Sequence, residues 1–156
     1  MVGKYAQPAG DATSFLTVAY PSASGAVQLL FANDNNYFGL YWGSMDSYNS
    51  IAFFENDEQL GTYSGANLAD LTGLVADGQQ QSASSNRYIE FNLGTSFYDK
   101  VILSTNGFGF EVDNIAFGEP AASVSASVLP ISEPGTLMVL GSSLYGLALV
   151  RRRRVR

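Results

Sequence analysis

Two carboxylates near the end of the acidic part of the chain are the residues best suited, by type and spacing, to acid–base chemistry. Glu111 and Asp113 stand two residues apart in a segment of alternating apolar and polar side chains. Both should therefore emerge on the same, exposed face of a strand. Such a pair could serve as general acid and base in an extracellular hydrolase. The same spacing is typical of the solvated face of a half-buried strand, and we favour that interpretation.

Other routes to catalysis are excluded by composition. The chain contains no histidine and no cysteine, and Lys4 and Lys100 are its only lysines. These absences exclude a histidine-based triad, a thiol nucleophile, disulfides and the usual zinc sites. The sequence also lacks a glycine-rich phosphate-binding loop. We therefore predict that the protein is not an enzyme, and we keep a hydrolase that uses Glu111 or Asp113 as the less favoured alternative.

Hard oxygen ligands of the kind that Ca²⁺ prefers occur in three places. Asp34 lies in the run of residues 33–36, Asp46 ends the segment 43–46, and Asp113 precedes Asn114. Ca²⁺ takes about six to eight oxygen ligands. Asn and Asp between strands are, however, more often simple turn formers. We predict no cofactor, with calcium at Asp34, Asp46 and Asp113 as the alternative.

Two tyrosines offer a different kind of site. Tyr37 and Tyr41 share one face of a predicted strand, with Gly39 between them. If that face is the outer one, their flat rings are available for stacking on sugar rings. Solvent-facing tyrosines are also common in strands that bind nothing. Carbohydrate binding at Tyr37 and Tyr41 is therefore a hypothesis that stands beside the plain structural interpretation.

These residues must be positioned by β-strands. Segments rich in aromatic and β-branched residues alternate with Asn-, Asp- and Gly-containing turns. The predicted strands are residues 14–20, 25–32, 37–42, 48–54, 59–63, 87–93, 98–104 and 108–117, and residues 66–71 have the composition of a short helix. Eight short strands at regular spacing predict an all-β protein, an antiparallel β-sandwich of jelly-roll-like form.

Alternation within the strands predicts which side chains form the core. Phe38, Leu40 and Trp42 share one parity, which we expect to face inward. The same argument places Ile89, Phe91 and Leu93 inside, with Tyr88, Glu90 and Asn92 on the solvent side. In the last predicted strand the apolar parity changes near residues 113–114, which predicts a β-bulge there.

Charge divides the chain into two unequal parts. Residues 1–130 carry thirteen acidic and three basic side chains, a net charge of −10, whereas the remainder has five arginines and one glutamate. An acidic body repels phosphate backbones, so nucleic acid is excluded as its partner. We expect a surface domain at residues 1–119, an Ala/Ser-rich linker at 120–131 and a tail at 132–156.

The tail has the pattern of a membrane segment. Ser132-Glu133-Pro134 is followed by an uncharged apolar stretch and then by clustered arginines. Residues 136–150 would make about 22 Å of helix, shorter than the roughly 30 Å hydrocarbon core. A buried helix in a soluble domain is the alternative, but the cationic end favours a membrane span. The residues that would span or line the membrane segment are Thr136, Leu137, Met138, Val139, Leu140, Leu144, Leu147, Leu149 and Val150, and those that would stay in the cytoplasm are Arg151, Arg152, Arg153, Arg154 and Arg156.

This order of motif, apolar helix and arginine cluster resembles the PEP-CTERM sorting signal of Gram-negative bacteria. The same C-terminal signature is also labelled an ice-binding-protein C-terminal domain, a name that does not itself imply ice binding. Ser132 stands where the family usually has the first proline, and Gly135-Thr136-Leu137 resembles the usual continuation. The resemblance implies sorting and processing by exosortase, with Ser132, Glu133 and Pro134 as the processing motif.

The body is similar to a group of exosortase-dependent surface proteins. The segments that carry this resemblance are residues 6–11, 37–44, 47–50 and 110–116. It implies a passage through the inner membrane, with the body outside the cytoplasm, and a destination at the cell surface or in a biofilm matrix. Exosortase, membrane lipid and, in the alternative interpretation, exopolysaccharide are the implied partners.

The N-terminal residues carry no apolar stretch of the kind that a secretory signal requires. Members of the resembling group begin with a signal peptide and one further β-segment. We therefore expect that Met1 is an internal or misassigned start and that the natural precursor is longer.

Overall fold

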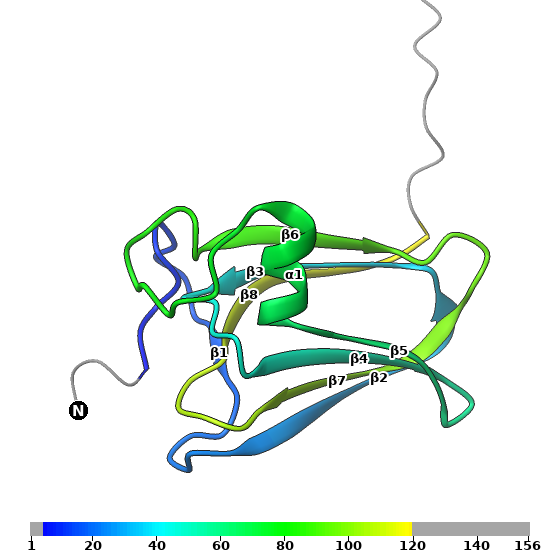
Figure 1. The fold of residues 1–156 in the computed structure, drawn as a ribbon. Coiled ribbons are helices and arrows are strands. Elements are labelled where there is room, and N and C mark those ends of the chain that lie inside the picture. The colour runs from blue at the N-terminus through cyan, green and yellow to red at the C-terminus, as the bar shows by residue number, and fades with distance from the viewer. Residues whose placement is uncertain (1–4, 120–156) are drawn as a thin grey trace, which may run out of the picture. The chain divides into compact units, whose positions relative to one another are not determined.

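The strands form two antiparallel sheets that face one another (Figure 1). The computed structural model describes residues 5–119. Sheet A has the order β1 (Leu16–Thr17), β8 (Glu111–Gly118), β3 (Tyr37–Gly43) and β6 (Arg87–Asn92). Sheet B has the order β2 (Gly25–Asn35), β7 (Tyr98–Thr105), β4 (Asn49–Glu55) and β5 (Glu58–Ser64). The prediction of an antiparallel β-sandwich is thereby confirmed.

The core fills the space between the sheets as the alternation predicts. Phe38, Leu40 and Trp42 of β3 have no exposed surface, and Ile89 and Phe91 of β6 are also buried. Sheet B contributes Ile51, Phe53, Tyr98, Val101 and Leu103. Aromatic rings dominate the contacts, because β-branched and aromatic side chains pack well on a pleated, half-buried surface.

A short helix closes one side of the sandwich. Helix α1 (Gly65–Thr72) follows β5 and lies on the side where β5 and β6 are edge strands (Figure 1). Ser64 and Asn67 form a reciprocal capping box, and Gly73 ends the helix in the left-handed conformation. Leu68 is its buried anchor. The helix expected at residues 66–71 is thus confirmed.

The predicted irregularity in the last strand is present. Gly39 of β3 pairs with Ala116 of β8, but Tyr41 pairs with Asp113, so β8 contains an extra residue between these pairs. Asn114, with a φ of 50°, is the residue in the left-handed region at this point. The bulge lets β8 change the parity of its inward side chains, as expected.

Some element bounds differ from the prediction. Strand β1 is limited to Leu16–Thr17, although the prediction spans residues 14–20. Strand β8 begins at Glu111 and not at residue 108, since Gly109 has a left-handed φ of 79°. Strand β2 continues through Asn35 with a register irregularity after Leu30, so most of the expected turn at 33–36 is strand. Side-chain composition alone does not show such tertiary pairing.

Candidate functional site

The outer face of sheet A brings together the residues in which the sequence indicated chemistry. Because Trp42 and Val112 pair in the core, their neighbours Glu111 and Asp113 point to the opposite, outer side. Tyr37, Gly39 and Tyr41 lie on the same side. The face is divided in two. One part lies under residues 6–13, which we call the strap, and the other part carries exposed tyrosine.

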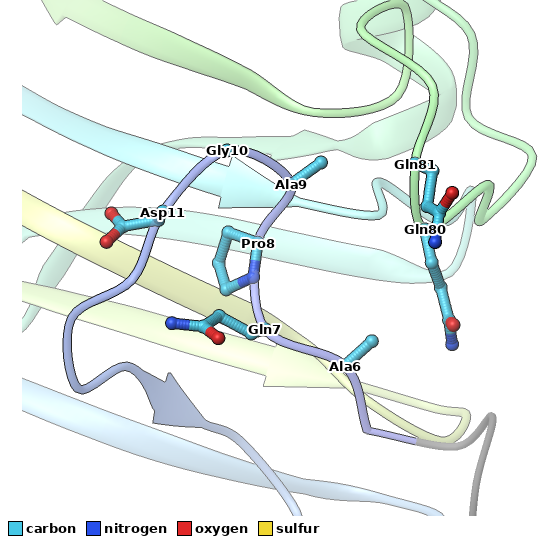
Figure 2. A pocket seen from close by; sticks show the side chains of 8 residues that line it. All are labelled: Ala6, Gln7, Pro8, Ala9, Gly10, Asp11, Gln80 and Gln81. Carbon is cyan, nitrogen blue, oxygen red and sulfur yellow. The ribbon is translucent and has the colours of Figure 1, made fainter.

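The strap is fixed to sheet A and to the loop before β6. The Tyr41 hydroxyl donates a hydrogen bond to the Ala9 carbonyl at 2.7 Å, and the Ala9 amide donates to Asn86 Oδ1 at 3.0 Å. Buried Pro8 packs on Gly43, where a side chain would have no space. Residues 6–11 and the pair Gln80 and Gln81 line an open cavity of about 440 Å³, with the two groups on opposite sides of it (Figure 2).

The close fit between Pro8 and Gly43 gives a test of the strap. A Cβ at residue 43 would lie 2.8 Å from the Pro8 Cβ, so Gly43→Ala should displace the strap. We expect amide hydrogen exchange in residues 6–13 to accelerate about tenfold or more, while β4 and β7 remain protected. Gly61→Ala is the matched control, because its nearest neighbour would lie at an ordinary 3.7 Å. Equal exchange in both variants would contradict the role of Pro8.

The far end of the strap is held by a polar network on β8. The Thr13 hydroxyl lies 2.6 Å from Asp11 Oδ1 and 2.5 Å from Asp113 Oδ2. Asn114 donates to Asp11 at 2.8 Å. The hydrogen bonds from Thr13, more than any other effect, lower the pKa of Asp11. Asp113 therefore has a structural partner in Thr13, a residue of the strap that also contacts Asp11.

Glu111 is the residue whose surroundings differ most from the prediction. Its parity is as expected, but only 2% of its surface is exposed, so the expectation of a solvated side chain is wrong. The strap, which is distant in sequence, covers it. Ser44 Oγ lies 3.3 Å from Oε2, and Oε1 has no hydrogen-bond partner. Burial raises the pKa of Glu111 to about 7, although hydrogen bonds partly offset this effect.

The two carboxylates do not share an open cleft. Glu111 lies under the strap, Asp113 is bonded to Thr13, and neither lines the strap cavity or the cavity beside β6 described below. General acid–base chemistry requires both groups within reach of one substrate bond. The geometry therefore supports a structural role for both residues.

The three aspartates proposed as calcium ligands are not brought together. Asp34 precedes β3 and Asp46 follows it, so the length of that strand, roughly 23 Å, separates them. Asp46 instead forms a β-bridge with Asp77, and burial raises its pKa. Within residues 5–119, no group of three acidic side chains is arranged to hold a metal ion.

The open part of the face carries two tyrosines, which differ from the predicted pair. Tyr41 is bonded to the strap, whereas Tyr88 of β6 lies opposite Tyr41 in the register and is 40% exposed. A Cβ at Gly39 would clash with the Tyr88 hydroxyl and lie 2.8 Å from the Tyr37 hydroxyl. Both hydroxyls therefore converge over Gly39. We call Tyr37, Gly39, Tyr88 and Glu90 the tyrosine shelf.

Glu90 fixes the orientation of the shelf. It pairs with Gly39 in the β3–β6 register and accepts a hydrogen bond from the Tyr37 hydroxyl at 2.9 Å. Burial, and then the hydrogen bonds with Glu90 and Tyr88, raises the pKa of the Tyr37 phenol. The sequence placed Tyr88 and Glu90 on the solvent side, but the strand pairing that joins them to Tyr37 could not be deduced from one strand alone.

A second cavity of about 620 Å³ adjoins the shelf at the free edge of β6. Its lining comes from the end of α1 and the start of β6. The residues are Thr72, Gly73, Leu74, Arg87, Tyr88, Ile89 and Glu90. We call this the edge cavity. Tyr88 and Glu90 belong both to it and to the shelf, so the two features form one surface.

The sorting motif, the membrane segment and the arginine cluster lie outside the described residues, as does the expected linker. Within the described range, no helix is long and apolar enough to cross a bilayer.

Fold and surface together define an antiparallel all-β sandwich with one partly covered outer face. Comparison with protein-family models, curated proteins and solved structures finds no match for the chain.

Proposed function

We propose that the chain is a non-enzymatic protein of the cell surface or extracellular matrix that exosortase sorts and processes through residues 132–156. The observation that carries the proposal is the order of Ser132-Glu133-Pro134, an uncharged apolar segment and five arginines. Arginines beside an apolar segment stay on the cytoplasmic side of a membrane. The segment would therefore span the inner membrane transiently, as a single helix, and hold the body outside the cytoplasm.

The body supports a role in display and not in catalysis. We propose that it is a jelly roll, since the strand orders are 1-8-3-6 and 2-7-4-5, and every connection except β4–β5 passes from one four-stranded sheet to the other. The two carboxylates that could have acted as acid and base have structural surroundings, with Glu111 covered and Asp113 bonded to Thr13. The tail supplies a destination, and the sandwich supplies the surface that is displayed there.

The sorting motif can be tested by fractionation. The precursor, led by a secretory signal peptide, is expressed in a Gram-negative host that carries exosortase. We expect the unaltered protein at the surface or in the medium, and Glu133→Ala in the inner membrane, because the altered motif escapes processing. Glu119→Ala, a change of the same charge outside the motif, is the control. Surface delivery of Glu133→Ala equal to the control would contradict the assignment of the motif.

The second candidate function is carbohydrate binding by the sandwich, with exopolysaccharide as the ligand. The observation that favours it is the tyrosine shelf, in which two aromatic side chains and an exposed carboxylate converge on an uncovered sheet face. Aromatic faces pack against the C–H groups of sugar rings, and carboxylates accept bonds from sugar hydroxyls. Display in a matrix and recognition of its polysaccharide are compatible functions.

A further inference from the structure

The tyrosine shelf has the geometry of a stacking platform. In a strand, Tyr37 and Gly39 are about 6.6 Å apart, which is roughly the distance from a tyrosine Cα to its hydroxyl. Because the Tyr37 hydroxyl lies over Gly39, its ring must lie along the sheet and not stand upright on it. Tyr88 reaches the same point from β6. The long axis of each ring therefore runs along the surface of the sheet and not away from it.

The shelf is organised before any ligand arrives. Tyr37 is held by its hydrogen bond to Glu90, and Tyr88 is near it over a residue that has no side chain. Holding rings in place reduces the conformational entropy that binding would otherwise cost. Tyr88 keeps 40% of its surface exposed, so it is ordered and accessible at once. This combination distinguishes the shelf from a tyrosine that merely points into solvent.

Polar groups surround the rings where sugar hydroxyls would lie. Glu90 is exposed and uses one oxygen for Tyr37, and a carboxylate can accept several hydrogen bonds. Arg87 donates through Nε to the Ala83 carbonyl, and its remaining guanidinium N–H groups are available as donors. The edge cavity, at about 620 Å³, lies within the range of about 300–1,000 Å³ that is typical of ligand sites.

Charge restricts the class of ligand. Residues 1–130 have a net charge of −10, and within the shelf and the edge cavity Arg87 is balanced by Glu90. Phosphorylated or uronic-acid ligands would be repelled by this field. A ligand with flat apolar faces, many hydroxyls and no charge fits both the rings and the field.

We propose that the tyrosine shelf and the edge cavity form a binding site for an uncharged oligosaccharide. The chain of the ligand stacks on Tyr37 and Tyr88 and bonds to Glu90 and Arg87. This inference rests on the second candidate function and goes further, because it replaces Tyr41 with Tyr88 and names the ligand class.

The test measures binding of the full-length chain to immobilised cello-, xylo- and manno-oligosaccharides, with uronic-acid oligosaccharides for comparison. We expect Tyr88→Ala to weaken the affinity for one uncharged series about tenfold or more, and Glu90→Gln about fivefold. Gly39→Ala should also weaken it, because the added methyl lifts both hydroxyls while the two rings remain. Tyr20→Ala, at a tyrosine that is 71% exposed elsewhere on the molecule, should change binding less than about twofold.

Each other outcome has a distinct meaning. If uncharged sugars bind to Tyr88→Ala and to Gly39→Ala as well as they bind to the unaltered protein, carbohydrate binding stands but the shelf is not its site. Binding to no sugar would overturn both this inference and the second candidate function. A preference for uronic acids would overturn the ligand class. If Tyr88→Ala changes only self-association in sedimentation, β6 is an edge that pairs with a second copy, and the inference fails.

Discussion

As the pH rises, the protein will lose stability, and replacing Glu111 with glutamine will prevent most of that loss. The folded-state pKa of about 7 lies above the ordinary value of 4.5, so the folded protein holds the proton more tightly than the unfolded chain. The contribution of Glu111 to stability is therefore full below pH 4.5 and is lost as the pH rises through 7. The difference amounts to about 3 kcal/mol. The cause is a carboxylate covered by the strap, with one oxygen that has no partner.

The measurement is urea unfolding at pH 5 and pH 8, followed by the fluorescence of Trp42, the single tryptophan. Between these values, Glu111→Gln should lose most of the slope of unfolding free energy against pH and be the more stable protein at pH 8. Burial raises the pKa of Asp46 too, so the contribution of Asp46 to this slope has the same sign. The lowered pKa values of Asp11, Asp57 and Asp77 act below this window.

Glu58→Gln is the control for this experiment, because Glu58 is exposed in β5. It should leave the slope unchanged. If the unfolding free energy of Glu111→Gln and that of Glu58→Gln change with pH in the same way, Glu111 does not carry its charge in a buried site.

Truncation of Phe38 will have the largest effect on stability that we predict. The ring is fully buried and packs against Phe31, Phe53 and Tyr98, with centroid distances of 6.5, 5.8 and 6.2 Å. Phe38→Ala removes these edge-to-face contacts and leaves a cavity between the sheets. We expect the free energy of unfolding to fall by about 3–5 kcal/mol. That is a large part of the roughly 5–15 kcal/mol available to a domain.

Phe117 supplies a matched control, since it pairs directly with Phe38 in the β3–β8 register but is 58% exposed. Phe117→Ala loses a single ring contact, to Phe31. We expect it to cost about 1 kcal/mol or less in urea unfolding at the same pH. Similar losses for the two variants would mean that the core does not lie where the alternation places it.

The sequence was sufficient to predict the strands and their inward faces, because period-two alternation in residues such as Phe38, Leu40 and Trp42 is a local signal. The same holds for α1, because the helix-forming composition of residues 66–71 is also a local signal. The bulge in β8 could be predicted because it changes the parity of apolar residues within one strand.

What could not be predicted depends on contacts between segments distant in sequence. Glu111 has the parity of a solvated residue, and only the strap, about a hundred residues earlier, makes it buried. Tyr88 was correctly placed on the solvent side, but its position beside Tyr37 follows from the pairing of β3 with β6. The tyrosine hydroxyls occupy the space over Gly39, and Pro8 occupies the space over Gly43. The neighbouring sequence of neither glycine indicates which group lies over it.

The central claim is that the tail is a sorting and processing signal, and the C-terminus of the mature protein tests it most directly. The precursor is expressed with a secretory signal peptide in a host that carries exosortase, recovered from the cell surface and digested for mass spectrometry. We predict that the surface protein ends near Glu133-Pro134 and lacks all five tail arginines. Recovery of surface protein that retains the intact end at Arg156 would contradict the claim.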